Sequence, residues 1–176
     1  MPNMESITIA QLQKKSVGIF NDVIGLFNIY IQLIRPRISL SENFPIYQRL
    51  VLAKPTVVIK TDEKIQLINS FEIFYLLGEL NSNNKLSKEK ILWGQIIEAD
   101  FCIRYAFYEL IDIIVRYSKS LDIELIYKHI NAFLTQEMKQ QLFNKKSLSI
   151  ATFCEELNIH EQTYYKRREK GLTDVN

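Results

Sequence analysis

The chain has 176 residues with a formal net charge of +2, and 47% of them are hydrophobic. This composition is typical of a folded globular protein and excludes a disordered chain. The charge excess is too small to wrap a polyanion, so contact with nucleic acid would have to come from a local basic cluster. Cys102 and Cys154 lie in separate segments and predict buried free thiols in a reducing compartment, with a disulfide as the lesser alternative. With only two histidines in the chain, no zinc motif can be written.

The stretch from residue 8 to about residue 34 is apolar and predicts a helix, a helix that runs into a strand, or both. Gly18 and Gly25 weaken a continuous helix. Residues 17–34 are about as long as a membrane span but include Asn, Asp and Gln side chains, which are costly in a bilayer. The Arg-Pro-Arg triplet at 35–37 should end the segment, because a residue before proline avoids the helical region. We therefore expect buried core rather than a membrane span, no secretory signal, and a cytoplasmic protein.

A hairpin and a helix are predicted next. The β-branched run at 55–60 and the alternating run at 65–68 predict two strands joined by a polar turn. Residues 69–80 have aromatic and aliphatic side chains at helical spacing, with Asn69 or Ser70 as the capping residue.

A third strand is predicted at 91–97, and no strand signal follows it. Strands that precede a run of helices indicate an α+β chain rather than alternating βαβ units. We expect a small N-terminal sheet with helices in residues 1–100, followed by an all-α region in residues 101–176.

Three helices are predicted at the start of that region. Residues 101–117 carry a strong apolar stripe at helical spacing. Residues 121–134 form a second such helix, with Ser120 as its expected cap. The third is a short helix at 135–143, capped by Thr135.

Two further short helices are predicted at 147–157 and 161–170, with Gly171 as the residue that ends the second. Their three-residue link has the properties of a helix-turn-helix. Asn158 tolerates the left-handed conformation that a sharp turn needs. Ile159 would fill the angle between the helices, and His160 can cap the second helix. Cys154 is small where the helices approach, and Tyr164 is the expected apolar anchor.

The stretch FCEELNIHEQTYYKRREKG resembles the helix-turn-helix of bacterial regulators, phage repressors and transposases, whose second helix often ends in a Thr-Tyr-Tyr-basic run. The positions of that pattern that are kept are Leu157, Ile159, Thr163, Tyr164, Tyr165 and Lys166. The sequence departs at Asn158, where glycine is usual, and at Arg167, where an apolar residue or tryptophan is common. The resemblance implies that residues 147–171 bind double-stranded DNA in a nucleoid-associated transcriptional regulator, or in a plasmid or phage partition-like factor.

A recognition helix places its first residues against base edges in the major groove. Gln162 could read adenine and Glu161 could read cytosine, while outward cations hold phosphates. The predicted DNA-binding residues are His160, Glu161, Gln162, Thr163, Tyr165, Lys166, Arg168, Lys170, Lys145 and Lys146. So few phosphate contacts per copy predict weak, salt-dependent binding by a monomer, and tight binding would require a homodimer.

The alternative interpretation is a solvated basic face on a terminal helix. Glu155, Glu156 and Glu169 lie among the basic residues and reduce the local positive charge. On this interpretation the chain is a non-catalytic adaptor whose terminal helices bind a protein partner.

Residues 55–80 resemble the ParB-type partition proteins and the related sulfiredoxin fold. In that family a strand, a polar turn and a strand ending in Leu-Ile precede a glycine- and arginine-rich motif that binds nucleotide phosphate. Here Ser70 replaces the glycine, and Glu72 and Ile73 stand where arginines are expected. Because a carboxylate repels phosphate, the resemblance implies a degenerate ParB-like domain without nucleotide binding or hydrolysis. The plain alternative is an ordinary hairpin packed on a helix.

No catalytic set is apparent in the sequence. Neither histidine belongs to a known nucleophile motif, and there is no phosphate-binding P-loop, so we expect no enzyme, no cofactor and no metal. Glu109 and Asp112 could share a helix face as metal ligands, or simply form its solvated side. A further aromatic set could stack bases, but its helical spacing favours core or a dimer surface. That set is Tyr105, Phe107, Tyr108 and Tyr117.

Overall fold

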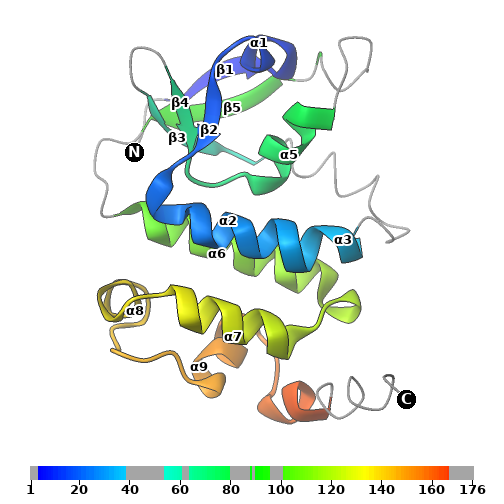
Figure 1. Ribbon diagram of the computed structural model, residues 1–176, viewed down its shortest axis with the longest axis vertical. Helices are drawn as coiled ribbons and strands as arrows, with labels where there is room; N and C mark the ends of the chain where they lie inside the picture. The colour runs from blue at the N-terminus through cyan, green and yellow to red at the C-terminus, as the bar shows by residue number, and fades with distance from the viewer. Residues whose placement is uncertain are drawn as a thin grey trace. The chain divides into compact units, whose positions relative to one another are not determined.

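The computed structural model describes residues 4–38, 54–60, 64–79, 88, 90–95 and 101–166. The chain divides into two compact units. The first consists of Met1–Phe27 and Glu42–Glu109, and the second of Asn28–Ser41 and Leu110–Asn176. A mixed five-stranded sheet with helices forms the N-terminal part, and the C-terminal region is mainly helical (Figure 1). The predicted α+β class is confirmed, whereas a domain boundary after residue 100 stays a prediction.

The sheet belongs to the first unit and mixes antiparallel and parallel pairs. In spatial order its strands are β1 (Met4–Thr8), β5 (Lys90–Gln95), β3 (Thr56–Lys60), β4 (Ile65–Leu67) and β2 (Val17–Ile19). β1 pairs with β5, and β3 with β4, in antiparallel fashion, whereas β3–β5 and β2–β4 are parallel. Val58, Leu67 and Ile91 are buried on one face, so that face packs on the core. The predicted hairpin is confirmed, and so is the third strand as far as Gln95; residues 96 and 97 lie outside the described part.

The N-terminal segment contains more elements than either predicted alternative. After β1 come the helix α1 (Ile9–Gln13), β2, the 3-10 turn η1 (Asn21–Val23) and the helix α2 (Ile24–Ile29). The Thr8 hydroxyl caps α1 by accepting the Gln11 N–H at 3.1 Å. The apolar stretch at 17–34 is therefore broken into several elements. No helix in the described ranges is long and apolar enough to cross a membrane.

The prediction that the Arg-Pro-Arg triplet ends this segment is wrong. α2 continues through a π-helical turn, η2 (Tyr30–Ile34), into α3 (Arg35–Ile38). Arg35 has helical φ and ψ angles of −53° and −43°, and its N–H bonds to the carbonyl of Tyr30. This bond widens the helix just before Pro36. A widened turn gives the proline ring room that a regular α-helical turn lacks.

Helix α5 (Phe71–Glu79) follows the hairpin as predicted. Phe27 meets the rings of Phe71 and Phe74 edge-on, at centroid distances of 5.5 and 5.2 Å. Gln13 Nε2 donates to the Leu77 carbonyl at 2.9 Å. Aromatic packing and this hydrogen bond thus join α5 to Phe27 and to α1 within the first unit.

The helices that follow are α6 (Cys102–Tyr117), α7 (Ile123–Phe133), α8 (Gln136–Phe143) and α9 (Ile150–Glu156). All four were predicted, and Thr135 caps α8 as expected, its hydroxyl accepting a backbone N–H at 3.2 Å. Ser120 does not cap α7. It belongs to a 3-10 turn, η5 (Ser118–Ser120), and Asp122 is the cap, accepting a backbone N–H at 2.9 Å.

Candidate nucleic-acid interface

The turn after α9 has the geometry predicted from Asn158. This residue has a φ of 52°, in the left-handed region. Its N–H bonds to the carbonyl of Glu155, and the N–H of Ile159 bonds to that of Cys154, both at 3.0 Å. Together these bonds form a Schellman motif, which satisfies the last carbonyls of a helix and turns the chain sharply. Asparagine makes the turn without glycine because it tolerates this φ.

His160 begins the second helix. Its Nδ1 accepts the Gln162 N–H at 3.3 Å, and its carbonyl accepts the Thr163 N–H at 2.8 Å. These are the contacts of an N-cap residue, so the predicted role of His160 is confirmed. The helix is described over residues 161–166. Its predicted far end and Gly171 lie outside the described residues.

Tyr164 anchors the second helix in an aromatic cluster. Only 3% of its surface is exposed, and its ring meets the Tyr127 ring edge-on at 6.2 Å. The Tyr127 ring in turn lies 5.3 Å from that of Phe153 on α9. Tyr165, the next residue, is 41% exposed. The predicted division of roles, with Tyr164 inward and Tyr165 outward, is confirmed.

Tyr127 is a member of this site that the sequence interpretation missed. Its hydroxyl donates to the carbonyl of Leu148 at 2.9 Å and so holds the segment that leads into α9. The available signal was periodicity, because Tyr127 follows Ile123 by four residues and precedes Ile130 by three. Both of those isoleucines are buried on the core side of α7.

Cys154 on α9 is 1% exposed and carries a free thiol. Burial raises the pKa of the Cys154 thiol, and the carboxylate of Glu161 raises it further. That a small residue lies where the two helices approach stays a prediction.

The predicted DNA-binding side chains divide by exposure. The exposed ones are His160, Glu161, Gln162, Tyr165, Lys166, Lys145 and Lys146. Thr163 is half-buried, and Arg168 and Lys170 lie outside the described residues. Lys145 Nζ lies 3.2 Å from the Thr152 hydroxyl, which places this ammonium group against the first turn of α9.

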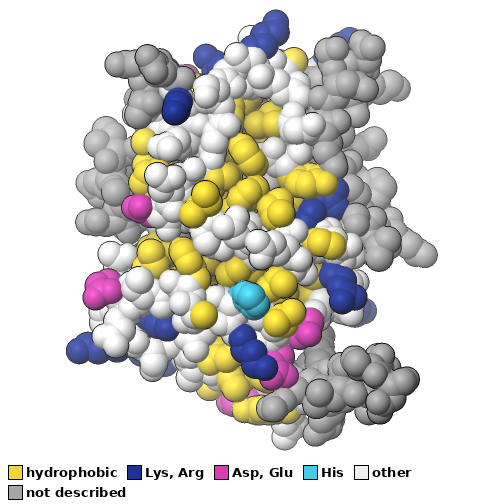
Figure 2. Space-filling model, in the orientation of Figure 1, with side chains coloured by type: hydrophobic (Ala, Val, Ile, Leu, Met, Phe, Trp, Pro, Cys, Tyr) yellow, Lys and Arg dark blue, Asp and Glu magenta, His cyan; other side chains and the backbone are white. Residues whose placement is uncertain are grey.

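Charges of both signs lie on the second, mainly helical unit. Glu155 is exposed on α9, and Glu161 is exposed at the start of the second helix, close to Lys166 in sequence. Figure 2 shows basic and acidic side chains interspersed over α7 and its neighbours rather than one continuous basic patch. Recognition of a polyanion here would therefore depend on individual placed cations.

Comparisons of the chain with protein-family models, curated proteins and solved structures give no significant match.

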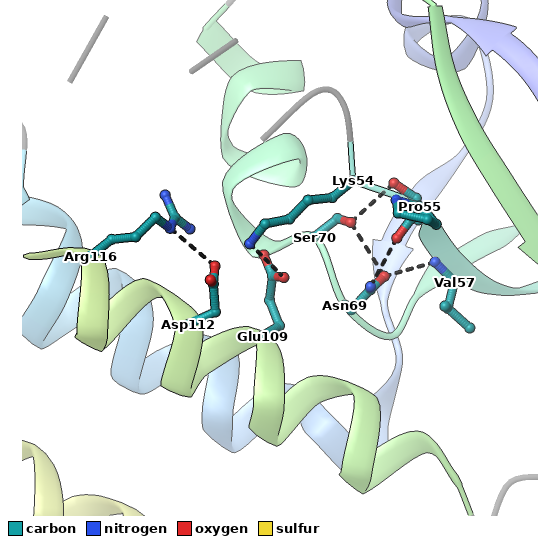
Figure 3. A network of polar contacts seen from close by, with 9 residues as sticks. Lys54, Pro55, Val57, Asn69, Ser70, Glu109, Asp112 and Arg116 are labelled. Atoms are coloured by element: carbon teal, nitrogen blue, oxygen red, sulfur yellow. Dashed lines mark hydrogen bonds and ion pairs between the residues drawn. The ribbon is translucent and has the colours of Figure 1, made fainter. Parts of the chain in front are cut away.

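The segment that resembles the ParB-type nucleotide motif forms an internal polar junction (Figure 3). Asn69 Oδ1 accepts the Val57 N–H at 2.7 Å, and Asn69 Nδ2 donates to the Pro55 carbonyl at 3.1 Å. One side chain thus ties the start of β3 to the turn between β4 and α5. The chain leaves this turn through Ser70, whose φ is 62°.

The hydroxyl groups of this junction are also paired internally. The Ser70 and Thr56 hydroxyl oxygens are 3.0 Å apart, and both residues are buried. Glu72, in the first turn of α5, is buried as well. The Asn69 amide and the two hydroxyls therefore make contacts within the protein, which gives this turn a structural role. The absence of nucleotide binding stays a prediction.

Glu109 and Asp112 each pair with a cation of their own unit. Glu109 Oε2 lies 3.8 Å from Lys54 Nζ, and Asp112 Oδ2 lies 3.0 Å from Arg116 Nε (Figure 3). Glu109 is buried, so the expectation that both residues form a solvated helix side is wrong for it. Across the described ranges, no three His, Cys, Asp or Glu side chains gather as they would around a metal ion.

We expect the Tyr127 hydroxyl to make the stability of the aromatic cluster depend on pH in the alkaline range. Burial raises the pKa of Tyr127, and the neighbouring Tyr165 adds to the increase. A raised folded-state pKa means that the phenol contributes its full stability below about pH 10 and loses it as the pH rises through the raised value. Tyr127→Phe should cost about 1 kcal/mol at neutral pH, through the lost bond to Leu148, and should flatten the alkaline fall in stability. Denaturant unfolding of both proteins across this pH range measures the difference, and parallel curves would contradict the assignment.

Proposed function

We propose that this chain is a non-enzymatic, sequence-specific DNA-binding protein, acting as a transcriptional regulator or partition-like factor. It would read double-stranded DNA with the helix that begins at Glu161. The observation that carries the proposal is the contrast between adjacent tyrosines, Tyr164 buried and Tyr165 exposed. A helix held on one side by the core and exposed on the other meets the geometric requirement for entry into the major groove.

The exposed residues suit the two kinds of contact that such a helix makes. Glu161 and Gln162 are in its first turn, where side chains face base edges, and they suit cytosine and adenine respectively. Tyr165 and Lys166 would hold phosphates, joined by Arg168 and Lys170 farther along the chain. Lys145 and Lys146 precede α9, so they would contact the flanking backbone as the first helix of such a pair does.

The second candidate function is a non-catalytic adaptor in which the same helices bind a protein. The exposed carboxylates of Glu155 and Glu161 favour it, because they would face phosphates unfavourably but could pair with cations of a protein partner. The two candidates differ in one measurable property. A DNA-binding surface releases counterions from the duplex, so its affinity falls steeply with salt.

The test is binding to a labelled mixed-sequence duplex across a potassium chloride series, for the intact chain and for Lys166→Ala/Arg168→Ala. Each lost phosphate contact lowers the magnitude of the slope of log affinity against log salt by about 0.9, so the double variant should lose about 2 units and bind about tenfold or more weakly at low salt. Fluorescence anisotropy provides both quantities.

The matched control is Lys14→Ala/Lys15→Ala, which removes the same charge from two exposed lysines of the first unit. The control should keep the slope of the unaltered protein. DNA reading by this helix is refuted if binding is absent at low salt, or if the two double variants behave alike.

A further inference from the structure

Helix α6 carries large apolar side chains on two opposite faces. Phe107 and Tyr117, from the aromatic set, are core residues with exposed fractions of 0% and 4%. The other face, continued by Phe101 directly before the helix, exposes aromatic and aliphatic side chains to between 38% and 46% of their full area. These are Phe101, Tyr105, Tyr108 and Val115. With Asp112 they repeat at spacings of 4, 3, 4 and 3 residues, which places them on one side of an α-helix. Their alignment follows from the geometry of this one helix.

Heptad-spaced apolar side chains exposed along a helix are the pattern by which helices pair with other helices. Asp112 lies within this stripe, and a carboxylate there disfavours stacking against the bases and phosphates of a nucleic acid. The contact that suits the stripe is therefore with protein.

We propose that this face of α6 binds a second copy of the chain, with the two α6 helices antiparallel about a two-fold axis at Tyr108. In a two-fold contact the same patch must complement itself. Phe101 lies seven residues before Tyr108, and Val115 lies seven residues after it. Each Phe101 therefore lies opposite the partner's Val115. At a rise of 1.5 Å per residue, this contact is about 10 Å from the axis.

Charges complement each other under the same symmetry. Exposed Arg104 lies four residues before Tyr108 and Asp112 lies four after it, so the arginine of one copy reaches the level of the carboxylate of the other. A carboxylate has room for this contact beside its pair with Arg116, because it can accept several hydrogen bonds. A parallel arrangement would instead place Asp112 against its own copy, and like charges repel.

This self-association would provide the second DNA-binding helix that tight binding by the proposed interface requires. The proposed self-association does not depend on DNA binding, because the cross-linking that tests it is measured without DNA. Either proposal can therefore fail while the other stands.

Cysteine cross-linking tests the arrangement, because both natural cysteines are buried and free. Only a residue on the two-fold axis meets its own copy, so Tyr108→Cys should oxidise to a covalent dimer. Leu125→Cys, at a similarly exposed apolar residue of α7, should form no covalent dimer and serves as the matched control. Non-reducing electrophoresis at equal protein concentration gives the dimer fraction.

A mixture of Phe101→Cys and Val115→Cys proteins keeps Tyr108 and should cross-link into a heterodimer, while each protein alone should not. Self-linkage of Val115→Cys would show a parallel pair and overturn the proposed symmetry. A monomer in sedimentation of the unaltered protein, with no cross-link in any variant, would overturn self-association through α6. A covalent dimer of Tyr108→Cys together with the heterodimer is the supporting result.

Discussion

Replacing Tyr164 with alanine is expected to lower the free energy of unfolding of the helical unit by about 3–5 kcal/mol, the usual cost of truncating a fully packed aromatic side chain. The ring is buried and meets the Tyr127 ring, so its removal leaves a cavity beside that ring. Denaturant unfolding followed by circular dichroism measures the change. Because Tyr164 holds the second helix, the proposed DNA binding should weaken with the loss of stability.

The adjacent tyrosine offers a matched control for this prediction. Tyr165→Ala removes the same atoms from a residue that is 41% exposed and loses mainly an edge contact with the Tyr164 ring at 5.4 Å. Its cost in stability should be no more than about 1 kcal/mol, while its effect on DNA binding should be clear. Equal losses of stability from the two substitutions would contradict the assignment of Tyr164 as the anchor.

The candidate site could be predicted from sequence to the extent that its geometry is local. The turn depends on Asn158, the cap on His160, and the inward side of the second helix on Tyr164, all within a few residues. Tyr127 could not be assigned to the site in this way, because its contacts with the terminal helices cross more than twenty residues of chain. Periodicity places it on the core side of α7 but does not name its partners.

The fold shows the same division between local and distant interactions. The helices after residue 101 were predicted because each carries its own apolar stripe. The cap of α7 was not predicted correctly. Ser120 and Asp122 are both capping residues, and the 3-10 turn at Ser118–Ser120 leaves the role to Asp122. Strand β1 was missed because Ile7 is its only buried residue, which leaves no alternation to detect.

The pairing of β1 with β5, at opposite ends of the N-terminal part, also lies beyond any local pattern. Partner choice in a sheet is a long-range property. Pro36 shows that even a strong local rule can fail, because the π turn before it makes a helical proline tolerable.

Replacing Asn69 with alanine is expected to cost about 2–3 kcal/mol in the first unit. The change leaves the part-buried Val57 N–H without its acceptor at 2.7 Å and removes the bond to the Pro55 carbonyl, and an unsatisfied buried donor costs about 1–3 kcal/mol. Gln95→Ala is the matched control: it deletes an exposed carboxamide whose bond to the Lys60 carbonyl is 3.5 Å long, and it should change stability by no more than about 0.5 kcal/mol.

Thermal and denaturant unfolding of the two variants distinguish a structural role for this turn from a ligand-binding one. If the Asn69–Ser70 turn kept its polar groups for a phosphate, as the motif it resembles does, removing the Asn69 amide would leave the unfolding midpoint nearly unchanged. The internal bonds of Asn69, together with the Ser70–Thr56 hydroxyl pair, predict the opposite result. On this argument the turn between β4 and α5 braces the hairpin.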